Sequence, residues 1–503
     1  MKVWFDTIPT QQIVSYGSEC QDDCDNDCPV TEEYPSFIFH SITKEDVQNI
    51  RTQVLQQISS LYFQECQDQR WLICDPVGTG RVVVVDEDAF ALLEHFHTQT
   101  TLHQVIPKIS MCSLVSIEKL VAVFYKLGFL QGTRRSSPIH EWNEPETLTA
   151  WLHVTNACNL RCHYCYLDKT SEHMADDTAY RSIDAIFRSA RMHDFQGVKL
   201  KYAGGEASLH LSNIVKIHDY AVEEAKKYGI AFNAHIHSNG VVLSQQSIEQ
   251  LKSRHIGVTI SLDGVGTYHD SQRPFINGQG SFKYVDRTIT RLLASNVTPH
   301  ITVTVSQRNL DGLLDLMRYI LERDMSFTLS YYRDNECTTN ITDLQFSEAQ
   351  MIAKMQDVYT LIEQNLPRRQ LLNSLIDKAN LASAHRYTCG VGRNYLVIDQ
   401  DGGVAKCQAD IKRRVTTINA RDPLQMIRDD RNGVQGLSVE DKEGCRTCEW
   451  RYWCGGGCPL LTHRITGRYD IKSPNCHIYK ALFPEALRLE ALRLLKYESP
   501  LAL

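Results

Sequence analysis

The sequence lacks the features that mark membrane proteins and nucleic-acid-binding proteins. No apolar run approaches the roughly 20 residues that a membrane-spanning helix requires. Positive charge is not in excess, since the formal net charge is −7, so no basic field is present to attract nucleic acid. The first residues, MKVWFDTIPTQQ, lack the apolar core and cleavage site of a signal peptide. These absences predict a cytoplasmic protein that binds neither a membrane nor nucleic acid.

Cysteine, in contrast, is abundant, with 17 residues in 503. Thiols stay reduced in the cytoplasm, so disulfides explain this number poorly. Metal binding explains it better, because thiolates suit iron–sulfur clusters and zinc. Three cysteines fall in 158–165 and seven in 389–476. These two segments are therefore the candidate metal sites.

The N-terminal part of the chain reads as an arm followed by a small mixed module. Residues 1–69 contain a polar, acidic stretch and then apolar residues at helical spacing over 43–66, which predict an arm and a helix. Within 70–133, the apolar runs WLICDP and RVVVVD flank a glycine turn and predict a hairpin. Helical patterns follow at 86–97, 101–109 and 115–127. The order of elements predicts a winged-helix-like domain.

Strands and helices alternate over 148–335, which predicts an α/β fold with a parallel sheet curved into a partial (β/α)6 barrel. Catalytic groups of such barrels lie on loops at the carboxyl ends of the strands. The expected strands are near 151–155, 198–203, 231–237, 256–262, 299–305 and 326–332, and the expected helices near 177–193, 212–228, 244–253, 281–295 and 309–322. A helical bridge over 336–388, a cysteine-rich domain over 389–485 and a C-terminal helix over 486–503 complete the expected domains. Helical spacing predicts that the closing helix itself lies near 479–496.

The first cysteine group, Cys158, Cys162 and Cys165, directly follows the first expected barrel strand. A 4Fe–4S cluster needs four ligands, so three cysteines leave one iron open to an external ligand. Two plainer alternatives are buried structural cysteines and a zinc site, although a closed zinc site wants four protein ligands. His153 and His163 have no supporting pattern, and we take them as structural.

With these cysteines, the sequence resembles the radical S-adenosylmethionine (SAM) superfamily. The resemblance implies that SAM chelates the open iron and is cleaved to a 5′-deoxyadenosyl radical. It also implies that Tyr164 contacts adenine and that Arg273 binds the SAM carboxylate. Ala207 stands where the family usually has proline after its GGE motif, a mild departure. The other SAM contacts that the resemblance implies are Gly204, Gly205 and Glu206 after the second strand, Ser238 and Asn239 after the third, and Ser261 and Asp263 after the fourth.

The second cysteine-rich segment resembles the SPASM extension of radical SAM peptide maturases, which holds two auxiliary 4Fe–4S clusters and brings the expected number to three. One zinc ion with spare thiols is the plainer alternative. Tyr395 stands where fuller relatives carry a further cysteine, so the inner cluster is expected either to take another ligand or to keep an open iron. The resemblance assigns Cys445, Cys448, Cys454 and Cys476 to one cluster and Cys389, Cys407 and Cys458 to the inner one.

The remaining cysteines are expected to hold no cluster. Cys20, Cys24 and Cys28 lie in the acidic arm, where a further metal site is the alternative to free thiols. The other four are expected to be core residues: Cys66, Cys74, Cys112 and Cys337.

The module over 70–133 resembles, by element order alone, the PqqD-like element that recognises ribosomally made peptides (RiPPs). That family binds a leader peptide as an added strand on a sheet edge. A DNA-binding winged helix is the rival, but the helix at 115–127 carries only Lys119 and Lys126.

Together the resemblances imply an oxidoreductase that cross-links a precursor peptide through a carbon–carbon (cyclophane-type) or thioether bond. An electron donor such as flavodoxin or ferredoxin would supply the electrons. One alternative is oxidation of Cys or Ser to formylglycine, as in anaerobic sulfatase maturases, but those enzymes carry Asp where this chain has Gln408. Another alternative is a non-catalytic iron–sulfur regulator. The sequence identifies no catalytic base.

Overall fold

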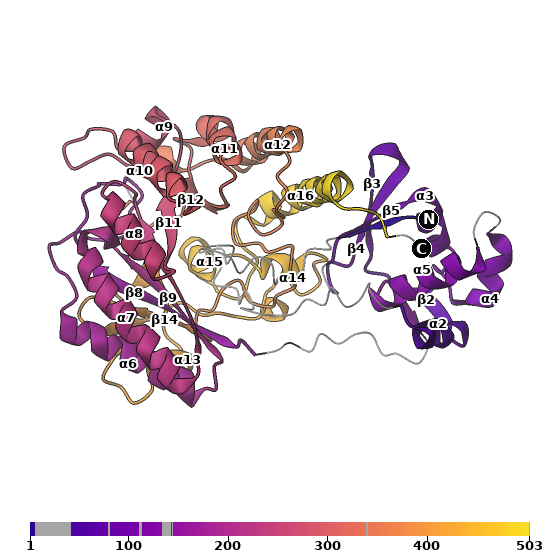
Figure 1. Ribbon diagram of the computed structural model, residues 1–503, viewed down its shortest axis with the longest axis horizontal. Helices are drawn as coiled ribbons and strands as arrows, with labels where there is room; N and C mark the ends of the chain where they lie inside the picture. Colours follow the sequence, from indigo (N-terminus) through magenta and orange to yellow (C-terminus); the bar gives the residue numbers. More distant parts are fainter. Residues whose placement is uncertain are drawn as a thin grey trace.

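The computed structural model describes residues 1–5, 42–78, 81–109, 113–132, 142, 144–338 and 341–501. Figure 1 shows the N-terminal module at one end, the barrel at the other and the cysteine-rich segment between them. The two ends of the described chain meet at the module, where the Leu501 N–H donates to the Val3 carbonyl at 2.8 Å.

The barrel has the six parallel strands expected from the sequence, in consecutive order. They are β8 (Thr147–Thr155), β9 (Gly197–Gly204), β10 (Ala231–Ser238), β11 (Gly257–Ser261), β12 (His300–Val305) and β13 (Phe327–Tyr331). The five expected helices are α6 (Asp176–Met192), α7 (Leu211–Tyr228), α8 (Gln245–Ser253), α10 (Phe282–Ala294) and α11 (Leu313–Leu321), with a short α9 (Thr267–Asp270). The α/β prediction is confirmed.

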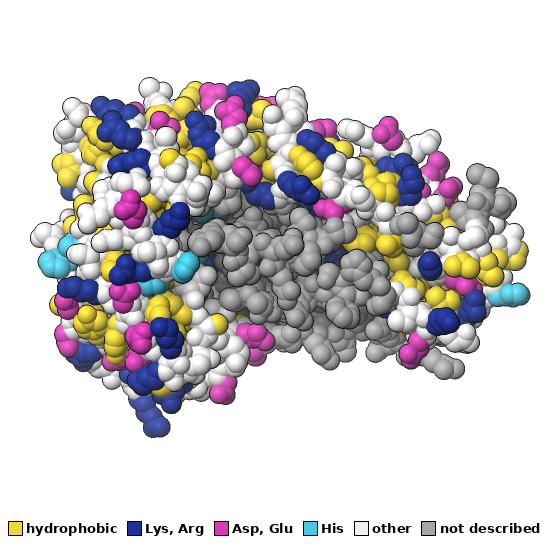
Figure 2. All heavy atoms as spheres, in the orientation of Figure 1, with side chains coloured by type: hydrophobic (Ala, Val, Ile, Leu, Met, Phe, Trp, Pro, Cys, Tyr) yellow, Lys and Arg dark blue, Asp and Glu magenta, His cyan; other side chains and the backbone are white. Residues whose placement is uncertain are grey.

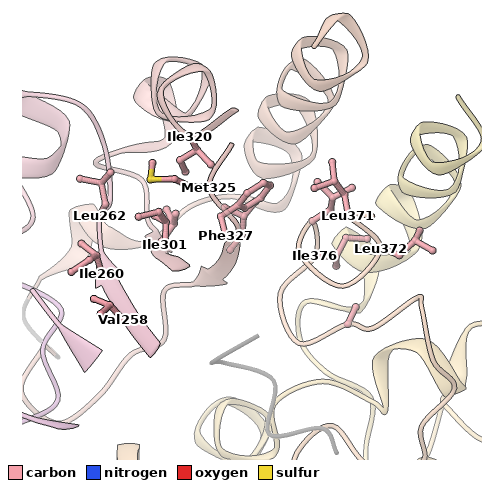
Figure 3. Close-up of a cluster of buried hydrophobic side chains, with 14 of the residues drawn as sticks. Val258, Ile260, Leu262, Ile301, Ile320, Met325, Phe327, Leu371, Leu372 and Ile376 are labelled. Carbon is pink, nitrogen blue, oxygen red and sulfur yellow. The ribbon is translucent and has the colours of Figure 1, made fainter. Parts of the chain in front are cut away.

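The strands have two chemically different faces. Along β11, Val258 and Ile260 belong to the core that packs beneath the helices, and Figure 3 shows them with Leu262, Ile301 and Phe327 in the apolar cluster. Side chains alternate between faces along a strand. The intervening residues, such as Thr259, therefore face the inside of the barrel.

The cysteine-rich segment continues the barrel sheet, which the sequence did not reveal. Strand β14 (Tyr395–Ile398) pairs parallel with β8, and β15 (Gly403–Ala405) and β16 (Arg414–Thr417) follow antiparallel. The resulting sheet has nine strands. The second cysteine segment is thereby tied to the strand that leads into the first.

The N-terminal module contains two small antiparallel sheets. The expected hairpin is present as β4 (Arg70–Cys74) and β5 (Val83–Asp86). Its sheet also contains β1 (Val3–Trp4), beside β5, and β3 (Tyr62–Cys66), beside β4. The second sheet contains β6 (Thr100–Thr101), β2 (Val54–Gln57) and β7 (Leu130–Gly132). The module's helices are α2 (Lys44–Arg51), α3 (Glu87–Glu94), α4 (Leu102–Val105) and α5 (Leu114–Lys126).

Three expectations about helices and boundaries are wrong. The helix over 43–66 ends at Arg51, and β2 and β3 follow because the sheets supply their pairing partners. The module accordingly draws on residues well before 70. Within the described part of 336–388, the α-helix is α12 (Glu348–Gln364), and turns and bends occupy most of the rest. The closing helix expected near 479–496 is confirmed as α16 (Cys476–Tyr497), but the expected domain boundary at 486 falls inside it.

Helix α16 links the parts of the molecule. It packs against α12 and reaches β3, β4 and β5 of the N-terminal module. The cysteine-rich segment also contains α13 (Pro423–Asp429), α14 (Arg451–Cys454) and α15 (Pro459–Thr466). Among the described residues, no helix combines the length and apolar character needed to cross a bilayer. On the face drawn in Figure 2, basic and acidic side chains are interspersed over the described surface.

Candidate active site

The loop that carries Cys158, Cys162 and Cys165 leaves the carboxyl end of β8, as expected. Its backbone is joined to a second loop, since the Arg161 N–H donates to the Pro274 carbonyl at 2.8 Å and the His163 N–H to the Gln272 carbonyl at 3.0 Å. The second loop follows β11. Two strand ends of the barrel therefore fix the position of the three thiols.

The three thiols lie within electrostatic reach of one another. Burial raises the pKa of Cys162 to about 12, and the neighbouring Cys165 and Cys158 act in the same direction. Zinc gathers all its thiolates within about 2.3 Å of one ion, whereas a cluster offers each thiolate its own iron. A cluster held by three thiols keeps one iron for an external ligand, whereas a closed zinc site takes four protein ligands.

The two glycines of the GGE sequence allow close packing against this cysteine loop. The Gly205 N–H donates to the Thr155 carbonyl at 2.6 Å, and the Glu206 N–H to the Ala157 carbonyl at 2.8 Å. A Cβ atom at Gly205 would lie only 2.5 Å from the Ala157 carbonyl oxygen. Glycine is thus required here by contact between two loops of the protein.

Glu206 is buried and joins the ends of two strands. Its carboxylate accepts hydrogen bonds from the Ser238 hydroxyl at 2.7 Å and the Asn239 N–H at 2.6 Å. The Asn239 amide in turn donates to Asn159 in the cysteine loop at 2.7 Å. The structure brings these expected SAM contacts together beside Cys158.

Tyr164, Asp263 and Arg273 form one buried network. Asp263 accepts from the Tyr164 hydroxyl at 2.5 Å and from Arg273 Nε at 2.8 Å. Burial alone would lower the pKa of Arg273, but the neighbouring Tyr164 and Asp263 oxygens outweigh it and hold that pKa well above its usual range. The contacts that Arg273 side-chain nitrogens make with described residues run through Nε. The residues expected to contact SAM thus also hold one another in place.

Sequence reasoning missed the residues that support Asp263. The Asn309 amide donates to the Asp263 carbonyl at 2.6 Å and to the Thr304 carbonyl at 2.9 Å. His269 accepts from the Asp263 N–H at 3.3 Å. Asn309 is 46 residues from Asp263, so no local signal could have found it, whereas His269 is only six residues from Asp263. Ser261, which was expected, lies at the end of β11 within 3.5 Å of the Thr302 hydroxyl.

His153 and His163 both contact other residues of the protein, in agreement with the expectation that they are structural. His153 is buried and contacts the Asn156 side chain at 2.7 Å. His163 contacts the Ser271 carbonyl at 2.9 Å, which adds a further link between the cysteine loop and the loop after β11.

Four of the C-terminal cysteines, those that the resemblance assigns to one cluster, line a single cavity. Trp450 and Phe483 contribute apolar walls. Burial raises the pKa of Cys454 to about 12 and that of Cys445 to about 11. The donor set is all thiol and fits a cluster with four cysteine ligands. The four cysteines are Cys445, Cys448, Cys454 and Cys476.

The other three, Cys389, Cys407 and Cys458, pack with Tyr395 in a small cluster of apolar side chains. The Tyr395 hydroxyl donates to Gln408 Oε1 at 3.0 Å. Tyr395 stands where fuller relatives carry a further cysteine, and Gln408 stands where the sulfatase maturases carry aspartate. These two replacements therefore contact each other.

Lys442 was not singled out by the sequence. It is buried and donates to the Gly455 carbonyl at 2.9 Å. Burial lowers its pKa, while thiols of both groups, including Cys445 and Cys389, act to raise it. Lys442 is therefore a cation placed between the two groups.

The scattered cysteines differ from one another. Cys74 is buried in the core as expected, and Cys66 is half-buried. Cys337 is exposed, so its assignment to the core is wrong. Cys20, Cys24, Cys28 and Cys112 lie outside the described residues.

Comparison with known proteins supports the barrel assignment. Residues 152–320 match the model of the Radical SAM superfamily. The chain is 30% identical over 180 residues to the Bacillus subtilis antilisterial bacteriocin subtilosin biosynthesis protein AlbA, covering 35% of this chain and 37% of that protein. It is 21% identical over 329 residues to a Clostridium perfringens cysteine-type anaerobic sulfatase-maturating enzyme, covering 61% and 86%. The chain therefore contains a radical SAM domain with homologues among peptide-maturation proteins.

A solved structure shares the fold. The structure of anSMEcpe with bound AdoMet matches with a TM-score of 0.56 at 17% identity, covering 70% of this chain and 98% of that chain. The likeness extends well past the barrel matched by the family model.

Proposed function

We propose that this protein is a radical SAM peptide maturase that installs a carbon–carbon or thioether cross-link in a ribosomally made precursor peptide. The observation that carries the proposal is the three-thiol loop at the carboxyl end of β8, flanked by Glu206 and by the Asp263–Arg273 pair. A second and a third group of thiols lie on a segment that continues the same sheet. This combination suits radical chemistry that needs further electron acceptors.

In the proposed site, Cys158, Cys162 and Cys165 hold a 4Fe–4S cluster. When bound, the cluster supplies the electron that cleaves SAM to methionine and a 5′-deoxyadenosyl radical. Glu206 and the nearby backbone accept hydrogen bonds from the SAM ammonium, and Arg273 binds the carboxylate through its terminal nitrogens.

The remaining SAM contacts of the proposal are polar and aromatic. Tyr164 would contact adenine, while its own hydroxyl donates to Asp263. Ser238, Asn239 and Ser261 lie at the ends of neighbouring strands, where ribose hydroxyls would come within hydrogen-bond reach. The backbone at Gly204 and Gly205 adds carbonyl acceptors.

The SPASM-like segment is proposed to hold two auxiliary 4Fe–4S clusters, which gives three clusters in all. The cavity lined by four cysteines would hold the outer one. The inner one would take Cys389, Cys407 and Cys458, with Tyr395 near its fourth position. We propose that this fourth iron is open to a substrate group, and spectroscopic detection of a fourth protein ligand would contradict this.

The N-terminal module is proposed to dock the leader of the precursor. Among the described strands, the sheet order is β1-β5-β4-β3, so β5 is already paired with β1. The edge to which a leader peptide would add a strand, as in PqqD-like domains, would then be β3. Hydrogen–deuterium exchange with precursor peptide tests this directly. Protection of Tyr62–Cys66 is expected, and unchanged exchange there would contradict the docking role.

Formylglycine formation is the second candidate, because a sulfatase-maturating enzyme is among the relatives. The Tyr395–Gln408 contact counts against it, since Gln408 replaces the aspartate of those enzymes and is already engaged. Both candidates place the protein in the cytoplasm, with flavodoxin or ferredoxin as electron donor.

The deciding experiment uses anaerobically reconstituted, reduced full-length protein. With SAM it should form 5′-deoxyadenosine, and a non-catalytic iron–sulfur regulator should form none. A peptide encoded beside the gene should then lose two hydrogens without gaining an aldehyde. A product that reacts with a hydrazine probe would favour formylglycine instead.

A further inference from the structure

The loop between α9 and α10 holds an apolar side chain out in solvent. Ile276 has the highest exposure, 63%, among the exposed large hydrophobic side chains of the described residues. It lies in a tight turn, where the Phe275 N–H donates to the Gln279 carbonyl at 2.8 Å and the Gly278 N–H to the Phe275 carbonyl at 2.9 Å. Gly278 has a φ of +79°, which glycine adopts without a steric penalty. The turn therefore has a defined backbone that exposes Ile276.

This turn is attached to the loop that carries the first three cysteines. Leu160 and Phe275 form an antiparallel bridge, next to the hydrogen bond from the Arg161 N–H to the Pro274 carbonyl. Arg161 is exposed and stands between two of the cysteines in the sequence. The surface around Ile276 is therefore continuous with the outer surface of the cysteine loop.

Two exposed cations of α10 lie on the other side of the turn. The ring of Phe275 packs edge-on against the ring of Tyr284, with 5.3 Å between their centroids. Lys283 Nζ lies 5.0 Å from the centre of the Tyr284 ring, and the guanidinium carbon of Arg287 lies 5.9 Å from it. Both cationic side chains are exposed. Ile276 is thus flanked by cations of α10 and by Arg161 of the cysteine loop.

The charges of this surface are available to a partner. None of Arg161, Lys283 and Arg287 forms an ion pair with a described acidic side chain. The two nearest acids in the sequence have other contacts, since Asp270 accepts a backbone N–H at the start of α10 and Asp286 accepts a tyrosine hydroxyl, each at 2.7 Å. The whole chain carries a net charge of −7, so these cations are a local feature and not part of a general basic field. The surface combines an apolar centre with a cationic border.

This surface lies away from the proposed leader-docking module. Figure 1 shows α9 and α10 on the barrel, at the end of the molecule opposite the N-terminal module. Strand β3, the edge proposed for leader docking, belongs to that module. A protein bound around Ile276 and a precursor peptide bound at β3 would therefore not compete for one surface.

We infer that the Ile276 face, made of Arg161, Ile276, Lys283 and Arg287, docks an acidic electron-donor protein that carries a flavin. The inference rests on the proposed function, because it assigns the place where the electron for the first cluster enters. Acidic side chains of the donor would meet the three cations, and the apolar dimethylbenzene edge of its flavin would meet Ile276. Flavodoxin has this chemistry, whereas a ferredoxin has no flavin edge to place on Ile276.

The position of the face suits the transfer of one electron. The anionic reduced flavin is oxidised by one electron, the cluster held by Cys158, Cys162 and Cys165 is reduced by one, and no proton has to move. Electron transfer slows steeply with distance, so the donor has to approach the cysteine loop closely. The Ile276 face adjoins that loop through the bridge between Leu160 and Phe275.

Surface plasmon resonance with immobilised flavodoxin tests the docking on the reconstituted full-length protein. Ile276→Asp should weaken binding by about tenfold or more, because it places a negative charge at the centre of the contact. Lys283→Glu should also weaken binding by about tenfold and reduce its dependence on salt. Two control variants lie elsewhere on the surface and should bind as the wild type does. They are Ile465→Asp on α15, where the isoleucine is 59% exposed, and Lys119→Glu on α5, where the lysine is exposed.

The binding results decide the inference whether or not the protein is active. Unchanged binding by Ile276→Asp and Lys283→Glu would overturn it, and so would equal losses in the two control variants. Ferredoxin provides the comparison between donors, and it should bind more weakly than flavodoxin. If ferredoxin binds more tightly, the choice of a flavin-bearing partner is wrong.

Rates of SAM cleavage separate this inference from the proposed function. Dithionite needs no docking, so Ile276→Asp and the wild type should form 5′-deoxyadenosine at equal rates with it. With reduced flavodoxin as the reductant, Ile276→Asp should be slower by about tenfold or more. Equal rates with flavodoxin would refute the docking face alone, and slower rates with both reductants would show that the turn supports the SAM site instead. Absence of 5′-deoxyadenosine from the wild type with dithionite would refute the proposed function, while the binding data still decide the docking.

Discussion

The buried pair of Asp263 and Arg273 gives the sharpest test of how the candidate site is held. The carboxylate is fully buried, and the arginine side chain is 10% exposed at an N–O distance of 2.8 Å. Asp263→Asn would leave the guanidinium in the interior without a counter-charge. Breaking a buried pair in this way costs about 3–5 kcal/mol of unfolding free energy.

A control pair at the surface has the same N–O distance. Arg308 and Asp343 also lie at 2.8 Å, but the Asp343 side chain is 62% exposed. Asp343→Asn should cost about 0–1 kcal/mol, because water screens such a pair. Denaturant unfolding of the two variants, followed by tryptophan fluorescence, measures both changes.

A double variant completes the test. Replacing both Asp263 and Arg273, with Asn and Met, should cost less than the sum of the two single changes, because no unpaired charge remains. The reasoning is refuted if Asp263→Asn costs less than about 1 kcal/mol, or if it matches Asp343→Asn. Additive single changes would likewise show that the pair is not coupled.

Three further changes test other parts of the structure. Burial raises the pKa of Cys162 and Cys454 to about 12, so the metal-free fold binds protons that the unfolded chain loses above pH 9. Its stability should fall by about 1.4 kcal/mol per thiol per pH unit above 9, seen as a lower urea midpoint at pH 10 than at pH 8. Gly456 has a φ of +83°, and a Cβ atom there would lie 2.6 Å from Lys442 Cδ. Gly456→Ala should therefore destabilise the protein and reduce its iron content after reconstitution. Unchanged iron content would contradict this. A buried positive charge favours the reduced form of a nearby cluster, so Lys442→Met should lower the reduction potentials of the auxiliary clusters. A redox titration monitored by electron paramagnetic resonance measures them. Unchanged potentials would contradict an electrostatic role for Lys442.

Local patterns predicted the barrel well. Its strands are short apolar runs between helical segments, and each element is largely specified within about 20 residues of chain. The three cysteines of 158–165 were likewise expected to act as one group, and in the structure one loop after β8 carries all of them. Such features need no knowledge of distant partners.

Predictions failed where distant segments decide the conformation. Val54 and Ile58 have helical spacing, yet Val54–Gln57 is a strand because Leu130–Gly132 pairs with it. The pairing of Tyr395–Ile398 with β8 is another case, since a strand's partner leaves no mark in its own sequence.

The sequence by itself determined the chemistry available to this protein: ten thiols in two spaced groups, a GGE turn and a succession of strand ends. Those are properties of neighbouring residues, and side-chain type and spacing specify them directly. Only the tertiary structure decided which of these groups meet. It joined Tyr164, Asp263 and Arg273 in one buried network, and it aligned Lys201 with His235 inside the barrel. Both outcomes depend on strand register and burial, which arise only when the whole sheet closes.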